Sequence, residues 1–145
     1  MDQGNDSIVG TWRLVSVVAR PASGGEAVNA MGENPSGFLT YTSDGRMTAI
    51  LASSGRQSLS VVDPVGAPAA ERAEAFATFI AYAGRYTVDA DRITHHVEVS
   101  WLQNWVGADQ IRFARLQGSV LTLRSPPTLM GGKPMVAELV WTRLG

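Results

Sequence analysis

The stretch Gly10–Val18 constrains the fold of this chain most strongly, because it places a tryptophan near the start of a β-rich segment. Its valines are β-branched, and such residues favour a strand over a helix. Gly10 allows a tight bend just before the large ring of Trp12, which needs an interior to enter. Alternation puts Trp12, Leu14, Ser16 and Val18 on one face, and Arg13, Val15 and Val17 on the other. We expect the first strand of a barrel, with Trp12 plugging one end and a cavity beyond it.

Further β-rich segments follow at short intervals. The eight predicted strands are Gly10–Arg20, Phe38–Thr42, Arg46–Leu51, Arg85–Val88, Ile93–Trp101, Ile111–Leu116, Val120–Arg124 and Val136–Arg143. Asp44-Gly45 lies between two of them, and this dipeptide favours a tight hairpin because the turn needs positive φ. The connections Pro21–Gly37 and Ser125–Gly132 are predicted to be loops, and Ser58–Val62 is a possible short strand.

One segment has helical periodicity instead. Pro68–Ala81 is rich in Ala and Glu, and Phe76 and Ile80 recur at helical spacing. Pro68 suits a first helical turn, and Gly84 lies just past the predicted end. Eight antiparallel strands with one helix predict an all-β fold, an eight-stranded up-and-down barrel with the helix near its mouth. We expect residues 1–145 to form one such domain, wide enough inside for one small ligand.

The composition excludes several classes of function. Hydrophobic residues make up 45% of the 145 residues and the net charge is -1 at pH 7, which is typical of a globular protein without a basic nucleic-acid surface. Cysteine is absent, so disulfides and thiolate metal sites are excluded. No apolar run approaches the roughly 18 residues of a membrane helix, and the polar, acidic N-terminus does not resemble a signal peptide. We expect a cytoplasmic monomer or homodimer, with no membrane or nucleic-acid partner.

Two adjacent histidines are the first candidates for chemistry, since histidine titrates near neutral pH. Adjacent strand residues point to opposite faces, so His95 and His96 cannot both enter the barrel without a bulge. The face with Ile93, His95, Val97, Val99 and Trp101 is apolar, which favours His95 as the inward ring. On the other face, His96 and Glu98 would form a base and carboxylate pair. Either ring could instead be structural, with its nitrogens satisfied by neighbouring hydroxyls.

The residues around the histidines are rich in hydrogen-bonding and aromatic groups. Candidate catalytic residues are His95, His96, Glu98, Tyr86 and Arg112, where an inward arginine would hold a carboxylate or an enolate. Candidate ligand-binding residues are Tyr41, Met47, Phe76, Ile80, Tyr82, Val97, Val99, Trp101, Asn104 and Trp105. Each aromatic residue also fits ordinary barrel packing, and Asn104 fits a turn. No metal or cofactor is expected, because metal-binding and dinucleotide-binding motifs are absent from the sequence.

Several motifs resemble a known family. Gly10-Thr11-Trp12 resembles the Gly-x-Trp of the lipocalin and fatty-acid-binding protein superfamily. The bacterial and fungal lipocalin-like branch has segments similar to Gly37–Tyr41 with Asp44–Met47, Thr94–Glu98 with Asn104–Gly107, and Leu121–Leu123 before Pro126-Pro127. The resemblance implies a lipocalin-like barrel with a small-molecule pocket, and an arginine, matched here by Arg143, that packs across the Trp12 ring. It implies no particular reaction.

Two functions remain open at this point. In the first, the barrel binds a small hydrophobic or aromatic molecule and acts on it as a cofactor-free isomerase, cyclase or lyase, using a pocket histidine with Tyr or Arg groups. In the second, the barrel is a non-catalytic binding or carrier protein. The expected cytoplasmic location favours the enzyme, because a carrier is needed less there. The ligand itself is not specified by the sequence.

Overall fold

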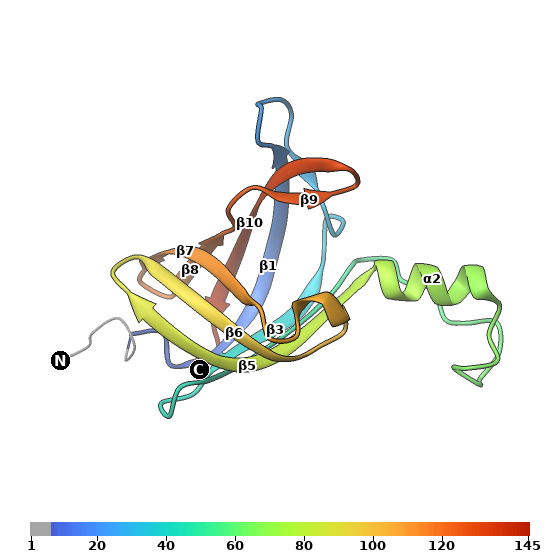
Figure 1. Cartoon of the computed structure of the whole chain (residues 1–145), viewed down its shortest axis with the longest axis horizontal. Coiled ribbons are helices and arrows are strands. Elements are labelled where there is room, and N and C mark those ends of the chain that lie inside the picture. The colour runs from blue at the N-terminus through green and yellow to red at the C-terminus, as the bar shows by residue number, and fades with distance from the viewer. Residues whose placement is uncertain (1–6) are drawn as a thin grey trace.

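The computed structural model describes residues 7–145, in which the strands form one closed barrel (Figure 1). The strands are β1 (Gly10–Pro21), β2 (Val28–Asn29), β3 (Ser36–Tyr41), β4 (Arg46–Ala52), β5 (Phe79–Asp89), β6 (Arg92–Ser100), β7 (Asp109–Gln117), β8 (Val120–Arg124), β9 (Thr128–Met130) and β10 (Lys133–Arg143). The helices are α2 (Ala69–Ala77) and the 3₁₀ turn η1 (Gln103–Trp105).

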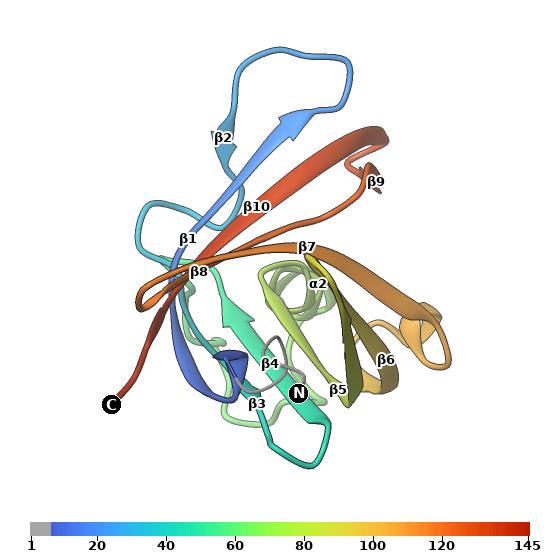
Figure 2. The ribbon, with the colours of Figure 1, turned by 90° about the vertical axis from the view of Figure 1, so that its left-hand side faces the viewer.

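The barrel closes through a pairing between the first and last long strands. Neighbours follow the order β1-β3-β4-β5-β6-β7-β8-β10, and β10 returns to pair with β1. This ring confirms the predicted eight-stranded antiparallel barrel. The short strands β2 and β9 pair beside β1 and β10 and extend one side of the wall. Figure 2 looks into the ring, with α2 visible beyond its far end.

The end of the barrel at the β3–β4 hairpin is closed by Trp12. The Trp12 side chain is fully buried, and its Nε1 donates to the Ile8 carbonyl at 2.9 Å. The Arg143 guanidinium lies 4.2 Å from the indole centroid, in the position that the family resemblance implied. Arg143 also donates hydrogen bonds to the carbonyls of Ser7 and Val9. A cation over the ring and two backbone acceptors fix this end of the molecule.

Two β-bulges change which residues face the interior. In β1 the register with β10 shifts between Leu14 and Ser16, so Val17 becomes buried, whereas Val15 is exposed as predicted. The predicted alternation, which put Val17 on the outer face, is therefore wrong beyond Val15. A second shift lies between Ala83 and Gly84 of β5, which pair with Val99 and Val97 of β6. The extra residue is therefore in β6, and the residues after Val97 change face. An extra residue in one strand reverses the facing of every residue after it.

Gly84 explains why the second bulge occurs at that position. A Cβ built on Gly84 would lie 1.9 Å from the carbonyl oxygen of His96, so only glycine allows this approach of β5 to β6. The sequence had suggested that Gly84 follows the end of a helix. It lies instead inside a strand, between β4 and β6.

The helix is shorter than the predicted Pro68–Ala81. It ends at Ala77, and β5 begins at Phe79, because Phe79 and Ile80 pair with Ala52 and Leu51 of β4. Pairing with a neighbouring strand here outweighs the local helical spacing. Ser58–Val62 forms no strand, whereas β2 and β9 lie in segments predicted to be loops. Within residues 7–145, no helix is long and apolar enough to cross a membrane.

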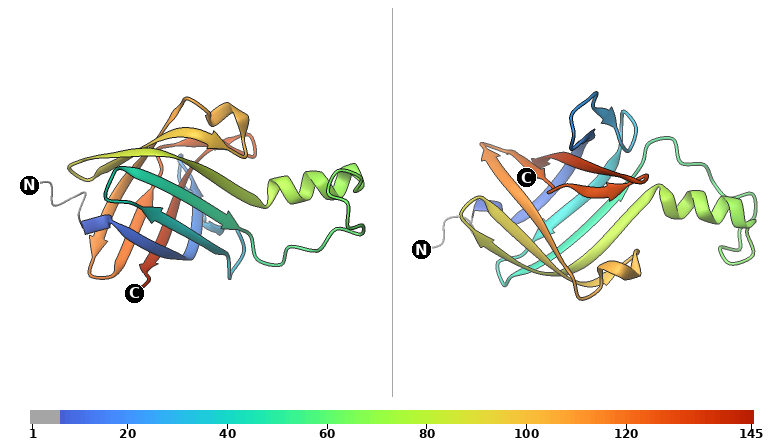
Figure 3. Two further views of the ribbon diagram at one scale, coloured as in Figure 1. Left: turned by 90° about the horizontal axis from the view of Figure 1, so that it is seen from below. Right: turned by 45° about the horizontal axis from the view of Figure 1, so that its top comes forward.

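Helix α2 lies in the β4–β5 connection, at the end opposite Trp12. Both views in Figure 3 show it extending away from the strands rather than lying across the ring. None of its residues is buried. Its last turn touches the barrel through Phe76, whose ring centroid is 5.9 Å from that of Trp101. Helix α2 therefore does not lie across this end of the barrel.

Candidate functional site

A buried histidine held between two tyrosines forms a polar cluster inside the barrel. The Tyr41 hydroxyl lies 2.6 Å from Nε2 of His95, and the Tyr82 hydroxyl lies 2.8 Å from Nδ1. Three strands supply these residues: β3, β5 and β6. His95 is 1% exposed and faces inward, as the apolar pattern of its face indicated. Both ring nitrogens of His95 have tyrosine hydroxyl partners, as expected for a histidine with a structural role.

Burial keeps the His95 ring neutral. Loss of solvent, with smaller effects from the charges of Arg112 and His96, lowers the pKa of His95 from 6.5 to about 3. A neutral imidazole has one N–H and one free lone pair. One tyrosine must therefore donate to His95 while the other accepts from it. The accepting tyrosine keeps its own proton available for another oxygen.

Arg112 brings a positive charge to this cluster. It pairs with Ile93 across the β6–β7 ladder, and paired residues point to the same face, so Arg112 faces inward. Burial raises the pKa values of Tyr41 and Tyr82, and the Arg112 charge opposes that rise in both. Together a hydroxyl proton and a guanidinium are suited to an oxygen that carries negative charge.

A row of aromatic rings leads from the cluster to the barrel opening. Ring centroids are 5.2 Å apart for Tyr82 and Trp105, and 5.1 Å for Trp105 and Trp101, and both pairs are edge-to-face. Phe76 of α2 extends the row beyond Trp101. The two tryptophans lie in and beside η1, which connects β6 to β7.

Solvent reaches the interior at the same end. Gln110, Leu139 and Ile80 pair with the buried residues His95, Leu123 and Leu51, so their side chains face inward. All three are nevertheless only partly buried. These inward-facing side chains are therefore the ones closest to solvent inside the barrel.

The comparisons with known proteins agree with this architecture. Residues 9–144 match the lipocalin-like domain family. The chain belongs to this family. A 4'-hydroxy-3'-methoxypropiophenone carrier protein from Aspergillus oryzae is 32% identical over 83 residues, which cover 51% of this chain and 75% of that protein.

Two solved structures are similar to this lipocalin-like barrel at low identity. A lipocalin-like protein from Bacteroides uniformis has 14% identity and a TM-score of 0.45, with 94% of this chain and 98% of that chain covered. A mutant of the fluorescent protein UnaG has 14% identity and a TM-score of 0.40, with coverage of 95% and 96%.

Two of the predicted catalytic residues lie on the outer face of the lipocalin-like barrel. His96 bonds to Asp109 at 2.8 Å and to Thr87 at 3.0 Å. Glu98 forms ion pairs with Arg46 at 2.6 Å and with Arg85 at 3.3 Å. The alternative pairing of His96 with Glu98 inside the barrel is therefore wrong, since both carboxylate and ring are bound to other groups outside it.

Tyr86 faces inward, but its hydroxyl is hydrogen-bonded at the Trp12 end of the barrel. Its hydroxyl donates to the Thr42 carbonyl at 2.8 Å, and its ring meets that of Tyr41 edge-to-face at 4.7 Å. Tyr86 therefore positions Tyr41.

The predicted ligand-binding residues separate into three groups. Tyr41, Met47, Tyr82 and Val97 are buried inside the barrel, and Ile80, Trp101 and Trp105 are partly buried near its opening. Phe76 is 48% exposed on α2, and Asn104 is exposed in η1. Val99 is 69% exposed, so the prediction that it faces inward is wrong. The bulge in β6 turns the Val99 side chain to the outer face of the sheet.

Three residues that the sequence did not single out also belong to the interior. Gln110 and Leu139 face inward near the opening, as described above. Trp141 is buried opposite Leu14 and Leu121, and its Nε1 has no hydrogen-bond partner among residues 7–145. The period-2 alternation with Arg112 indicates Gln110, but only the barrel closure places Leu139 and Trp141.

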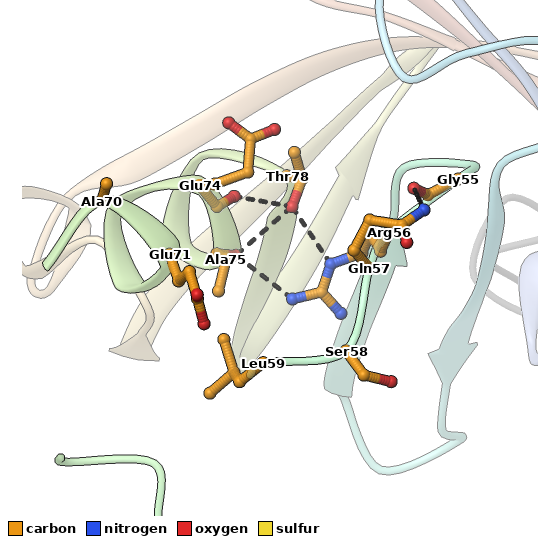
Figure 4. Close-up of a pocket in the computed structure, with 10 residues that line it drawn as sticks. All are labelled: Gly55, Arg56, Gln57, Ser58, Leu59, Ala70, Glu71, Glu74, Ala75 and Thr78. Atoms are coloured by element: carbon orange, nitrogen blue, oxygen red, sulfur yellow. Dashed lines mark hydrogen bonds between the residues drawn. The ribbon is translucent and has the colours of Figure 1, made fainter. Parts of the chain in front are cut away.

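A separate hollow of about 260 Å³ lies outside the barrel, between α2 and residues 55–59 (Figure 4). Arg56 crosses it, donating to the Thr78 hydroxyl at 3.1 Å and to the Ala75 carbonyl at 3.2 Å. Arg56 thereby satisfies the Ala75 carbonyl in the last turn of α2 and holds the preceding loop against the helix. We interpret this hollow as part of the contact between residues 55–59 and α2. No group of three or more potential metal ligands occurs in the part of the chain that the structure describes.

Proposed function

We propose that the barrel binds a small hydrophobic or aromatic molecule that carries a carbonyl or phenolic oxygen. The observation that supports this is the Tyr41–His95–Tyr82 cluster, with Arg112 beside it, inside an otherwise apolar interior. Polar groups buried in an apolar pocket fix the orientation of a ligand and give specificity.

The ligand oxygen would lie against the tyrosine hydroxyls and Arg112, with its ring system toward Trp105. The N–H of Trp101, which has no hydrogen-bond partner among residues 7–145, offers a second donor beside Trp105. A buried N–H without a partner is costly, so a ligand acceptor there would be favourable. The Aspergillus oryzae relative supports this ligand class, since its name describes a carrier of an aromatic ketone with a hydroxyl and a methoxy group.

Titration with 4'-hydroxy-3'-methoxypropiophenone tests the proposal directly. We expect saturable quenching of tryptophan fluorescence, because Trp105 lies on the path to the cluster. Tyr82→Phe should weaken binding about tenfold, the loss of one hydrogen bond of about 1.4 kcal/mol. His96→Gln, on the outer face, is the matched control and should bind like the parent. Equal affinity for the parent, Tyr82→Phe and Tyr41→Phe would exclude the cluster as the oxygen site.

A second candidate function, cofactor-free isomerase, cyclase or lyase chemistry, is favoured by Arg112. A guanidinium beside a tyrosine hydroxyl could stabilise an enolate formed from a bound ketone. The tyrosine that donates to His95 would take the α-proton on its oxygen while its own proton passes to the lone pair of the ring, and the reverse transfer would return a proton to the carbon. A pKa of about 3 makes His95 a weak acceptor in this relay, so Arg112 would have to stabilise the enolate oxygen.

Exchange of hydrogen for deuterium tests this chemistry without knowledge of the product. An aryl ketone incubated with the protein in deuterium oxide should lose its α-proton NMR signal faster than in buffer. Arg112→Gln should abolish the acceleration, whereas His96→Gln should retain it. Exchange at the buffer rate, together with saturable binding, would leave the carrier function and reject the catalytic one.

A further inference from the structure

A second hollow, of about 280 Å³, lies at the Trp12 end of the barrel. We call it the Ile93 hollow. Its apolar wall consists of Ile8, Val88, Ile93, Ala114, Leu116 and Leu121. Ile8, Ile93 and Leu121 are almost completely buried, whereas Ser7, Ala90 and Asp91 at its rim are exposed. The hollow therefore runs from the surface into the core.

The Ile93 hollow is distinct from the polar cluster. None of Tyr41, Tyr82, His95 and Arg112 lines it. It exists because the inward-facing position of β7 between Arg112 and Leu116 is occupied by Ala114. A small side chain at a position opposite large ones leaves space that its neighbours do not fill.

The rim of the Ile93 hollow is held in place by the β5–β6 turn. The Ala114 N–H donates to the Asp91 carbonyl at 2.6 Å, which fastens this turn to β7. Ala90 has a φ of 56°, a left-handed conformation that a non-glycine residue rarely adopts. The Asp91 carboxylate makes no hydrogen bond or ion pair within residues 7–145, so a negative charge stands unpaired at the entrance.

We propose that the Ile93 hollow is a second binding site, which takes a one-ring aromatic molecule with a short chain that ends in an amine. An apolar cavity of about 150 Å³ is enough for benzene, so the larger hollow accommodates a ring and a short chain. The ring would contact Ile93, Leu116 and Leu121, and the ammonium group would lie at the rim near Asp91. An exposed carboxylate adds a preference of about two- to fivefold for a cation.

Three probes of similar size test the charge preference: 2-phenylethylamine, 2-phenylethanol and 3-phenylpropionate. Each is titrated into the full chain while the methyl signals of Ile93, Leu116 and Leu121 are followed by NMR. We expect saturable shifts, with the amine binding most tightly and the carboxylate most weakly. Asp91→Asn should weaken the amine about two- to fivefold and leave the alcohol unchanged.

A variant in which a larger side chain fills the Ile93 hollow provides the second test. Ala114→Leu should reduce the affinity for all three probes about tenfold or more, because its side chain occupies the ring position. If Ala114→Leu does not fold, Val88→Phe fills the same hollow from the rim. Tyr82→Phe should leave probe binding unchanged, which separates this site from the polar cluster. Shifts that do not saturate, shifts that persist in the filled variant, or shifts confined to residues around Tyr82 would overturn the proposal.

Discussion

Lowering the pH is expected to destabilise the barrel through one residue, His95. The His95 ring is buried between Tyr41 and Tyr82, and its pKa falls from 6.5 to about 3 on folding. The unfolded chain therefore takes up a proton near pH 6.5, while the folded chain does not. A group with a lowered folded pKa that stays neutral in the native state stabilises the protein above its unfolded pKa. That contribution is lost as the pH falls toward the folded pKa.

The size of the effect follows from the pKa difference. Between the two pKa values, one proton bound by the unfolded state alone lowers the free energy of unfolding by about 1.4 kcal/mol per pH unit. At about pH 5 the loss relative to about pH 8 is therefore roughly 2 kcal/mol. Below that range, protonation of Glu71 and Glu98 adds to the loss, since hydrogen bonds also lower the pKa values of these carboxyls.

Urea unfolding at a series of pH values between about 5 and 8 measures this slope. His95→Gln should remove the slope, because glutamine offers the tyrosines a donor and an acceptor but no titrating group. His96→Gln is the matched control on the outer face and should keep it. If the parent and His95→Gln lose the same free energy between these pH values, His95 is not buried as a neutral ring, and the reasoning fails.

Three further predictions concern stability. Tyr41→Phe leaves one nitrogen of His95 without its hydroxyl partner, so the free energy of unfolding should fall by about 1–3 kcal/mol in urea titrations. Arg143→Leu removes the cation over Trp12 and two bonds to backbone carbonyls, and thermal or urea unfolding should show a loss of about 2 kcal/mol. Gly84→Ala places a methyl group against the backbone of β6, so we expect a loss of about 3 kcal/mol or failure to fold, measured by circular dichroism.

Each of these predictions has a control. His95→Leu combined with Tyr41→Phe should cost less than the sum of the single changes, because the Tyr41–His95 hydrogen bond is then lost only once. Arg85→Leu removes an arginine from an exposed ion pair and should cost less than about 1 kcal/mol. Gly118→Ala changes a left-handed turn position with no atom near its Cβ, and should cost about 1 kcal/mol. An additive loss in the double variant, or equal losses for Arg143→Leu and Arg85→Leu or for Gly84→Ala and Gly118→Ala, would contradict the corresponding prediction.

Much of the fold was predictable because its signals are local. Strand positions follow from β-branched and aromatic runs between turn residues, and Asp44-Gly45 alone identifies a hairpin. The alternation of apolar residues also identified His95 as the inward histidine. The end of the helix was harder to predict, because Phe79 and Ile80 fit both a helix and a strand. Their pairing with β4 places them in a strand.

The site was predictable in its residue types but not in its connections. Tyr41, Tyr82, His95 and Arg112 were all candidates, yet His95 and Tyr41 are 54 residues apart in the chain. Their contact depends on how β3 and β6 lie around the ring. The outward turn of Val99 depends on a bulge, which exists because a carbonyl of one strand lies against a glycine of the next.

By itself, the sequence determined an eight-stranded barrel with Trp12 at one end and the region that supplies its polar interior, since these follow from periodicity and turn chemistry within short segments. Tertiary structure decided the partners of His95, the outer-face pairing of His96 and Glu98, and the small residue Ala114 that leaves the Ile93 hollow. Those features depend on which strands become neighbours and in what register. Pairing between distant segments fixes them, and no local pattern records it.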